Sequence, residues 1–161
     1  MSPANSYAKQ VIELARTRGV KIATAESCTG GLIAGALTDI AGSSAVVDRG
    51  FVTYSNSAKM EMLEVSPETL QAHGAVSSQT AQQMAEGALA HSQASLTVSV
   101  TGIAGPGGGS ADKPVGLVWF GLAQAGKPTR TLSRKFGDVG RDRVRALTVE
   151  QALRLLIDAL G

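Results

Sequence analysis

The sequence has few of the side chains that bind metals or form disulfides. Among its 161 residues there is one cysteine, Cys28, and there are two histidines, His73 and His91. A single cysteine excludes an internal disulfide and a cysteine-rich zinc site, and two histidines are too few to suggest a metal centre. We therefore expect a protein of a reducing compartment.

Aromatic residues are also scarce, at 4%, and the formal net charge is only +2. Both values are too small for a protein that stacks bases and neutralises many phosphates, so nucleic acid is not an expected partner. The positive charge lies mostly after residue 126, with eight Lys/Arg against four Asp/Glu. A local basic patch suits one small anionic ligand better than a polyanion.

Long apolar runs are missing from the amino-terminal segment, residues 1–19. Charged side chains interrupt its apolar positions, so it is predicted to be neither a signal peptide nor a membrane span. We expect a cytoplasmic protein without a membrane partner.

Glycine, by contrast, is abundant, and its 19 residues separate short stretches of regular pattern. Helical stretches alternate with apolar, β-branched stretches before a carboxyl-terminal hairpin, which indicates a single α/β domain over residues 1–161. We predict a three-layer α/β/α sandwich with a mixed, mostly parallel sheet of about five strands. Strands are expected at 20–24, 46–55, 95–102, 116–123 and 129–136, and helices between Pro3 and Gly19, at 32–42, 56–65, 77–91 and 141–160, with another helical turn or two at 66–74.

Three polar or glycine-rich stretches follow the first three predicted strands. They are TAESCTGG (24–31), TYSNSAK (53–59) and TGIAGPGGG (101–109). In α/β proteins ligands bind beyond the carboxyl ends of parallel strands, so these stretches are expected to meet around one pocket. The third lacks both common nucleotide-binding glycine patterns, which argues against a nucleoside triphosphate loop.

The first stretch offers two possible nucleophiles just before a predicted helix. Ser27 can act as one if backbone N–H groups around Thr29 to Gly31 hold an oxyanion, because glycine lets the backbone approach a substrate closely. The alternative is an N-cap serine in a packing turn. Cys28 is a rival nucleophile if the helix N-terminus lowers its pKa, and otherwise a small buried residue.

A serine nucleophile needs a base, and neither histidine has a suitable context. Lys59 can serve if burial lowers its pKa, and Tyr54, five residues earlier, can face the same pocket. The alternative is a surface lysine on a short helix. Glu26 either holds Lys59 or caps a turn.

Two further features can contact a ligand. Thr101 ends a buried strand, where its hydroxyl either faces the pocket or caps its own turn. Arg141 and Arg145 lie four apart at the start of the last helix, where an anion would meet guanidinium groups and the helix dipole. Solvated arginines paired with Asp138 or Asp142 are the alternative.

In combination the motifs resemble the CinA C-terminal domain family over nearly the whole chain. The resemblance rests on TAESCTGGLIAGALTDIAGSS, GFVTYSNSAKMEMLEV, GAVSSQTAQQMAEGA and TGIAGPGGGSADKPVGLVWFGLA, in that order. Where the family often has LGV after its lysine helix, this chain has Leu63-Glu64-Val65.

The resemblance implies hydrolysis of the carboxamide of nicotinamide mononucleotide by a serine amidohydrolase without a cofactor, since stand-alone members of the family are nicotinamide mononucleotide deamidases. By motif, it implies a Ser/Lys arrangement of Ser27 and Lys59, assisted by Tyr54. Substrate contacts are expected from Thr29, Gly30, Gly31, Thr101, Gly102, Gly105 and Arg141. The partner is then a small mononucleotide, and a homodimer is expected as the commonest closed assembly. A non-catalytic nucleotide-binding module and a Cys28 hydrolase are the alternatives.

Overall fold

A five-stranded mixed sheet forms the centre of the molecule, in the order β2-β1-β3-β4-β5. The computed structural model describes residues 2–161. Strands β1, β2 and β3 are mutually parallel, β4 is antiparallel to β3, and β5 is antiparallel to β4, so only β4 runs against the other four. The predicted mixed, mostly parallel sheet is confirmed. The strands are β1 (Ile22–Glu26), β2 (Val47–Val52), β3 (Leu96–Gly102), β4 (Leu117–Gln124) and β5 (Arg130–Lys135).

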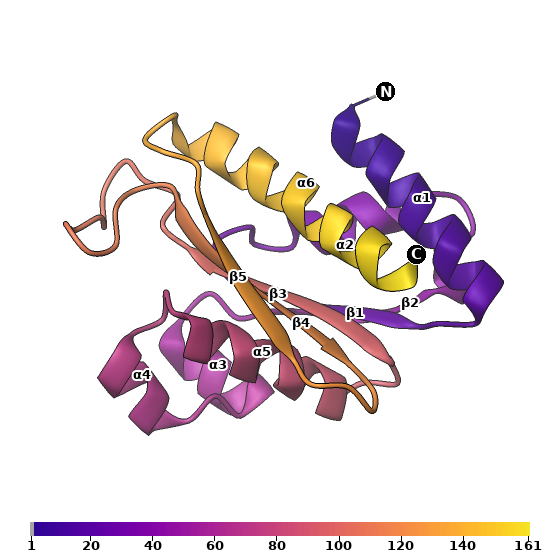
Figure 1. Cartoon of the computed structure of the whole chain (residues 1–161), viewed down its shortest axis with the longest axis horizontal. Coiled ribbons are helices and arrows are strands. Elements are labelled where there is room, and N and C mark those ends of the chain that lie inside the picture. Colours follow the sequence, from indigo (N-terminus) through magenta and orange to yellow (C-terminus); the bar gives the residue numbers. More distant parts are fainter. Residues whose placement is uncertain (1) are drawn as a thin grey trace.

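Helices cover both faces of this sheet, which confirms the α/β/α arrangement (Figure 1). On one face lie α1 (Pro3–Arg18), α2 (Leu32–Thr38) and α6 (Arg141–Leu160), and on the other lie α3 (Asn56–Leu63), α4 (Pro67–His73) and α5 (Ser78–Ala90). A 3-10 turn, Ser43–Ala45, precedes β2.

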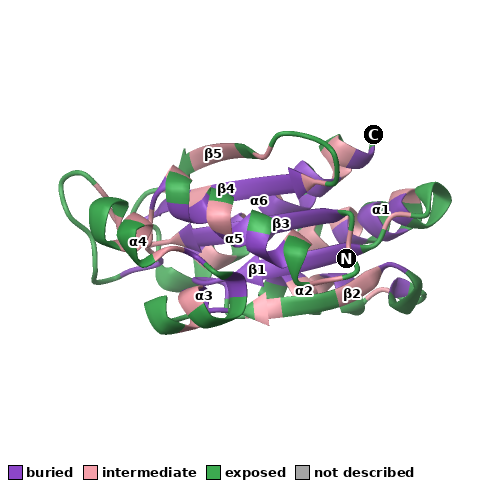
Figure 2. Ribbon diagram, turned by 90° about the horizontal axis from the view of Figure 1, so that it is seen from below, coloured by how far each residue is buried: buried purple, intermediate pink, exposed green. Residues whose placement is uncertain are grey.

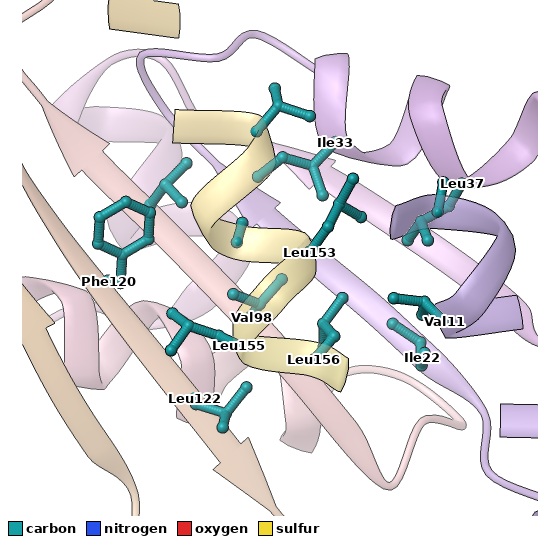
Figure 3. Packing of buried hydrophobic residues seen from close by; sticks show 14 of the residues in the cluster. Val11, Ile22, Ile33, Leu37, Val98, Phe120, Leu122, Leu153, Leu155 and Leu156 are labelled. Carbon is teal, nitrogen blue, oxygen red and sulfur yellow. The ribbon is translucent and has the colours of Figure 1, made fainter. Parts of the chain in front are cut away.

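The larger apolar core lies between the sheet and the helices α1, α2 and α6 (Figure 3). Leu153 and Leu156 of α6 are fully buried there, as are Ile33 of α2 and Phe120 of β4. Large aliphatic side chains dominate this layer, and each contributes about 1.5–3 kcal/mol on burial. This layer fixes where α6 begins relative to the ends of the strands.

On the opposite face of the sheet, α5 packs closely on the strands. Its alanine-rich face lets the Thr97 and Ser99 hydroxyls of β3 donate hydrogen bonds to the carbonyls of Ala85 and Ala81, at 2.7 and 2.6 Å. A side chain at Gly87 would collide with the backbone of Leu63, so α3 and α5 also approach closely. Figure 2 shows the outcome, with central strands β1 and β3 mostly buried and edge strand β2 more exposed.

Several predicted boundaries shift in the structure, and strand β2 ends at Val52 rather than at residue 55. Strand β1 runs to Glu26 rather than residue 24, because Ala25 and Glu26 still pair with β2 and β3. Helix α2 ends at Thr38 rather than residue 42, and Gly42 has a left-handed φ of 86°. The turn predicted at 66–74 is a separate helix, α4, with Ser66 as N-cap and Pro67 in its first turn.

The departure from the family's LGV pattern lies at the end of α3. Glu64 has φ 58°, and it is the sole non-glycine residue with positive φ among residues 2–161. Glycine is the usual residue at such a helix end because it has no Cβ to oppose this conformation. The Glu64 carboxylate instead contacts His91 Nε2 at 2.8 Å on the surface.

No helix within residues 2–161 is both long and apolar enough to cross a membrane.

Candidate active site

The three polar or glycine-rich stretches meet around a cavity of about 290 Å³ at the carboxyl ends of β1, β2 and β3. This is close to the lower end of the range for small-molecule pockets, about 300–1,000 Å³. Eight residues singled out from the sequence line it: Ser27, Cys28, Tyr54, Lys59, Thr101, Gly102, Gly105 and Arg141.

Ser27 lies immediately after β1, where the sheet still holds its backbone. Its N–H donates to the Val100 carbonyl of β3 at 3.1 Å, and its carbonyl accepts from the Gly30 N–H at 3.0 Å. The side chain is 8% exposed and lines the cavity. The nucleophile candidate is therefore rigidly held and still open to a ligand.

Lys59 reaches Ser27 from the first turns of α3. Ser55 caps this helix by accepting the Ala58 N–H at 3.0 Å, which fixes the start of α3 and so the direction of the lysine. Lys59 Nζ lies 3.0 Å from Ser27 Oγ. It also donates to the carbonyls of Thr53 and Tyr54, at 2.9 and 3.3 Å.

Burial lowers the pKa of Lys59 below its ordinary value of 10.5. The side chain is 1% exposed, and it forms no ion pair within the described part of the chain. The neighbouring Cys28 acts in the opposite direction on this pKa. That effect needs a thiolate, which is not expected at neutral pH because burial raises the pKa of Cys28 to about 11.

Cys28 is a buried thiol in the same turn. Desolvation by burial raises its pKa from 9.0 to about 11, against the lowering effect of its own backbone N–H. A reactive cysteine has the opposite shift, because the thiolate is the nucleophile. The structure thus favours the small buried residue over the reactive thiol for Cys28.

The three contacts of Lys59 Nζ match the three N–H donors of a charged amine, with Ser27 Oγ as one of the acceptors. Once Nζ is neutral, the two carbonyls can accept its two N–H donors, and its lone pair can accept the Ser27 hydroxyl proton, as a general base requires.

Glu26 caps helix α2 and does not contact Lys59. Its buried carboxylate accepts hydrogen bonds from the N–H groups of Ile33 and Ala34, at 2.8 and 2.9 Å, and from the Thr29 hydroxyl at 2.6 Å. Gly31, the N-cap residue, has no side chain to do this. Of the two alternatives for Glu26, the structure supports the cap.

Arg141 and Tyr54 form the rim of the cavity on the side of α6. Arg141 donates to the Gly105 carbonyl at 2.8 Å and to the Tyr54 hydroxyl at 2.9 Å. Gly105 has φ 81°, and a Cβ there would lie 2.5 Å from Val115, so only glycine can present its carbonyl in this way. Tyr54 therefore touches Lys59 through its backbone carbonyl, while its exposed side chain orients Arg141.

Thr101 and Lys113 connect the glycine-rich loop region to the segment before α5. The Thr101 hydroxyl donates to the Ala75 carbonyl at 2.8 Å, and Lys113 Nζ donates to the His73 carbonyl. Thr101 thus lines the cavity, but its hydroxyl binds a carbonyl of the segment before α5. Neither alternative given for this hydroxyl, facing the pocket or capping its own turn, described that contact.

Thr29, Gly30 and Gly31 do not line the cavity. The Gly30 N–H is already bonded to the Ser27 carbonyl, so its predicted oxyanion role needs correction. Gly31 has φ 105° and begins α2, while the Thr29 side chain turns to Glu26. Among residues 2–161 the backbone N–H groups of Cys28, Thr29 and Gly31 have no backbone hydrogen-bond partner, and of these three residues only Cys28 lines the cavity.

Two contributors were absent from the sequence prediction. Asn56 lines the cavity from the first position of α3, and the Thr53 carbonyl accepts from Lys59. Asn56 lies inside the TYSNSAK motif, so the motif itself could have pointed to it. The Thr53 contact is made by a backbone carbonyl, which every residue has, so no sequence pattern could have pointed to it. Residues 2–161 contain no group of three or more metal-ligating side chains.

The fold and the site together define an α/β protein with a buried serine–lysine pair at the carboxyl ends of parallel strands. The family model of the CinA C-terminal domain matches residues 4–160, and the chain belongs to this family.

The chain is similar both to proteins of about its own length and to longer proteins. The nicotinamide-nucleotide amidohydrolase PncC of Enterobacter agglomerans is 55% identical over 147 residues, which cover 88% of each protein. A putative competence-damage inducible protein of Caldicellulosiruptor bescii is 51% identical over 146 residues. That match covers 91% of this chain but only 35% of the longer relative.

A solved structure supports the same fold. The crystal structure of the competence/damage inducible protein CihA from Agrobacterium tumefaciens is 56% identical in sequence, with a TM-score of 0.96. The match covers 99% of this chain and 96% of that one.

Proposed function

We propose that residues 1–161 form one amidohydrolase domain that converts nicotinamide mononucleotide and water to nicotinate mononucleotide and ammonia. The observation that carries this proposal is the 3.0 Å contact between Lys59 Nζ and Ser27 Oγ, made by a buried amine with a lowered pKa. The relative from Enterobacter agglomerans, whose name specifies a nicotinamide nucleotide and amide hydrolysis, supports the substrate.

In the proposed first half-reaction, Ser27 Oγ attacks the carboxamide carbon while neutral Lys59 accepts the hydroxyl proton. The positive pyridinium ring makes the carboxamide more electrophilic than an ordinary amide. Collapse of the tetrahedral intermediate breaks the C–N bond, and Lys59 returns its proton to the departing ammonia. The product of this half is an ester between Ser27 and the nicotinoyl group.

In the second half, water attacks this ester and Lys59 again accepts the proton. The Ser27–carbonyl bond then breaks, and the serine recovers a proton from Lys59. The two half-reactions consume one water and release one ammonia and one carboxylic acid. Every proton passes through Nζ, whose two other contacts, to Thr53 and Tyr54, hold it in place throughout.

The phosphate of the substrate needs a cation, and Arg141 is the cavity-lining residue suited to bind it. Its guanidinium group has five N–H donors, and the contacts to Gly105 and Tyr54 leave donors free for phosphate oxygens. Gly102, Gly105 and Thr101 shape the wall beside it. A homodimer and a cytoplasmic location stay predictions.

The test is ammonia release from nicotinamide mononucleotide, nicotinamide riboside and free nicotinamide. We expect release chiefly from the mononucleotide, and its loss in Ser27→Ala. Ser57→Ala is the matched control, because Ser57 is an exposed serine on α3 that does not line the cavity. Binding of the mononucleotide without ammonia release by folded wild-type protein would instead establish the non-catalytic module.

A further inference from the structure

The turn that carries Ser27 is held from the opposite side by Arg145, a residue of α6 that does not line the cavity. Arg145 Nε donates to the Cys28 carbonyl at 3.1 Å, and its Nη2 donates to the Thr29 carbonyl at 3.3 Å. One planar guanidinium group therefore binds two consecutive carbonyls of the turn. Such two-point binding is specific to arginine, because the lysine ammonium is a point donor.

Binding the Cys28 carbonyl also fixes the direction of the next N–H group. In a trans peptide the C=O and the following N–H point in opposite directions. With the Cys28 carbonyl directed at Arg145, the Thr29 N–H is directed away from Arg145. The N–H groups of Cys28, Thr29 and Gly31 have no backbone partner among the described residues, and of these three residues only Cys28 lines the cavity.

A second contact holds the same residue from the side of the sheet. The Thr29 hydroxyl donates to Glu26 Oε1 at 2.6 Å, and Glu26 is itself anchored by the start of α2. The adjacent glycines have positive φ, 59° at Gly30 and 105° at Gly31, so this backbone is intrinsically able to change conformation. Two polar side chains are thus required to keep one peptide orientation.

The positive charge of Arg145 adds to the effect of these hydrogen bonds on the turn. Arg145 is partly buried and forms no ion pair with a carboxylate among residues 2–161. A cation bonded to a carbonyl polarises that peptide and makes its N–H a stronger donor. The peptide groups that follow Cys28 and Thr29 are therefore both oriented and polarised from the α6 side.

We propose that Arg145 is a positioning residue for catalysis: by binding the Cys28 and Thr29 carbonyls, it holds the turn that carries Ser27 in the conformation from which the serine attacks the substrate. This inference rests on the proposed amidase function. Arg145 itself touches neither substrate nor reacting atoms. Arg141, one turn earlier, has the separate task of contacting the ligand.

The first experiment compares Arg145→Gln and Arg145→Lys with the wild type in ammonia release from nicotinamide mononucleotide. Loosening the turn that carries the nucleophile is expected to reduce kcat about 10- to 100-fold, while KM changes less than threefold. Arg143→Gln is the matched control, because Arg143 is exposed on the same helix and is expected to keep wild-type kcat. A normal kcat in a folded Arg145→Gln protein would overturn the proposal, as would a loss confined to KM.

Chemical rescue separates positioning from a general structural role. We expect added guanidinium ion to raise the kcat of Arg145→Ala at least tenfold. The concentrations used lie well below those that denature the protein. Added sodium at equal ionic strength is the control and should restore nothing. No rescue in a variant with wild-type thermal stability would contradict the proposal. If the glutamine variant does not fold, the lysine variant and this rescue still decide the matter.

A second probe does not depend on the natural substrate. Phenylmethanesulfonyl fluoride forms an O–S bond with Ser27, fluoride leaves, and the hydroxyl proton passes to Lys59. Intact-mass measurement of this labelling is expected to be about tenfold slower in Arg145→Gln, with Ser27→Ala as the unlabelled control. Wild-type labelling without ammonia release would refute the proposed substrate but retain the role of Arg145. An unchanged labelling rate in folded Arg145→Gln would refute that role alone.

Discussion

Replacing Lys59 by methionine tests both the catalytic and the electrostatic consequences of its burial. Methionine keeps most of the buried aliphatic volume but removes the amine that lies 3.0 Å from Ser27 Oγ. Loss of a general base typically reduces the rate 10²- to 10⁴-fold, or about 2.7–5.4 kcal/mol at 1.36 kcal/mol per factor of ten. The measurement is kcat for ammonia release at saturating mononucleotide.

The same substitution changes how stability depends on pH. Unfolded Lys59 titrates near 10.5, and folding lowers this pKa through desolvation. Between the folded pKa and 10.5 the unfolded chain binds one more proton than the folded one. Wild-type stability therefore rises with pH in that window by up to about 1.36 kcal/mol per unit, and below the folded pKa the full destabilisation is present.

Lys59→Met lacks this titration, so its stability relative to the wild type should fall as pH rises toward 10.5. The free energy of unfolding can be measured by urea titration between pH 7 and 10, with the fluorescence of Trp119, the only tryptophan, as the probe. Lys127→Met, at an exposed position, should show no such slope against the wild type. Parallel stability curves for Lys59→Met and the wild type, or a kcat within threefold of it, would refute the reasoning.

Three further predictions follow from the site and from the end of α3. Cys28→Ala should keep kcat within about threefold, because a thiol with a pKa of about 11 is not the nucleophile; inactivation of the folded variant in the ammonia assay would restore the cysteine mechanism. Arg141→Gln should reduce kcat/KM about 10- to 100-fold for nicotinamide mononucleotide but less than threefold for the riboside, which has no phosphate. Equal losses for both substrates would contradict a phosphate contact. Glu64→Gly should stabilise the protein by about 0.5–1 kcal/mol in urea titrations without changing kcat, because φ 58° favours glycine; a stability loss would show that the His91 contact outweighs the backbone effect.

The sequence predicted the order of helices and strands well, because those elements depend on local pattern. Ser66-Pro67 marked the start of α4, and the run of β-branched residues marked β3. Predicted boundaries failed where pairing partners lie far away in the chain. Strand β1 continues to Glu26 because β2 and β3 still flank it there, and no local pattern contains that information.

For the candidate site too, the sequence predicted some features, and others needed the tertiary structure. The sequence singled out Ser27, Lys59 and Arg141 because they occupy loops and helix starts next to strand ends, where parallel strands converge by geometry. The sequence alone left open whether Glu26 holds Lys59 and whether Cys28 is reactive. It also assigned the oxyanion to N–H groups around Thr29 to Gly31, of which the turn uses that of Gly30 internally.

Residue types and their spacing along the chain thus determined the elements, the sheet and the three loops that meet around the cavity. Only the tertiary structure decided the chemistry within them. The pKa of Lys59 falls because several separate segments remove it from water, and the Thr29 N–H is oriented because Arg145, more than a hundred residues later, binds the neighbouring carbonyls. Desolvation and hydrogen-bond direction depend on which distant groups come together in space, so one-dimensional spacing does not specify them.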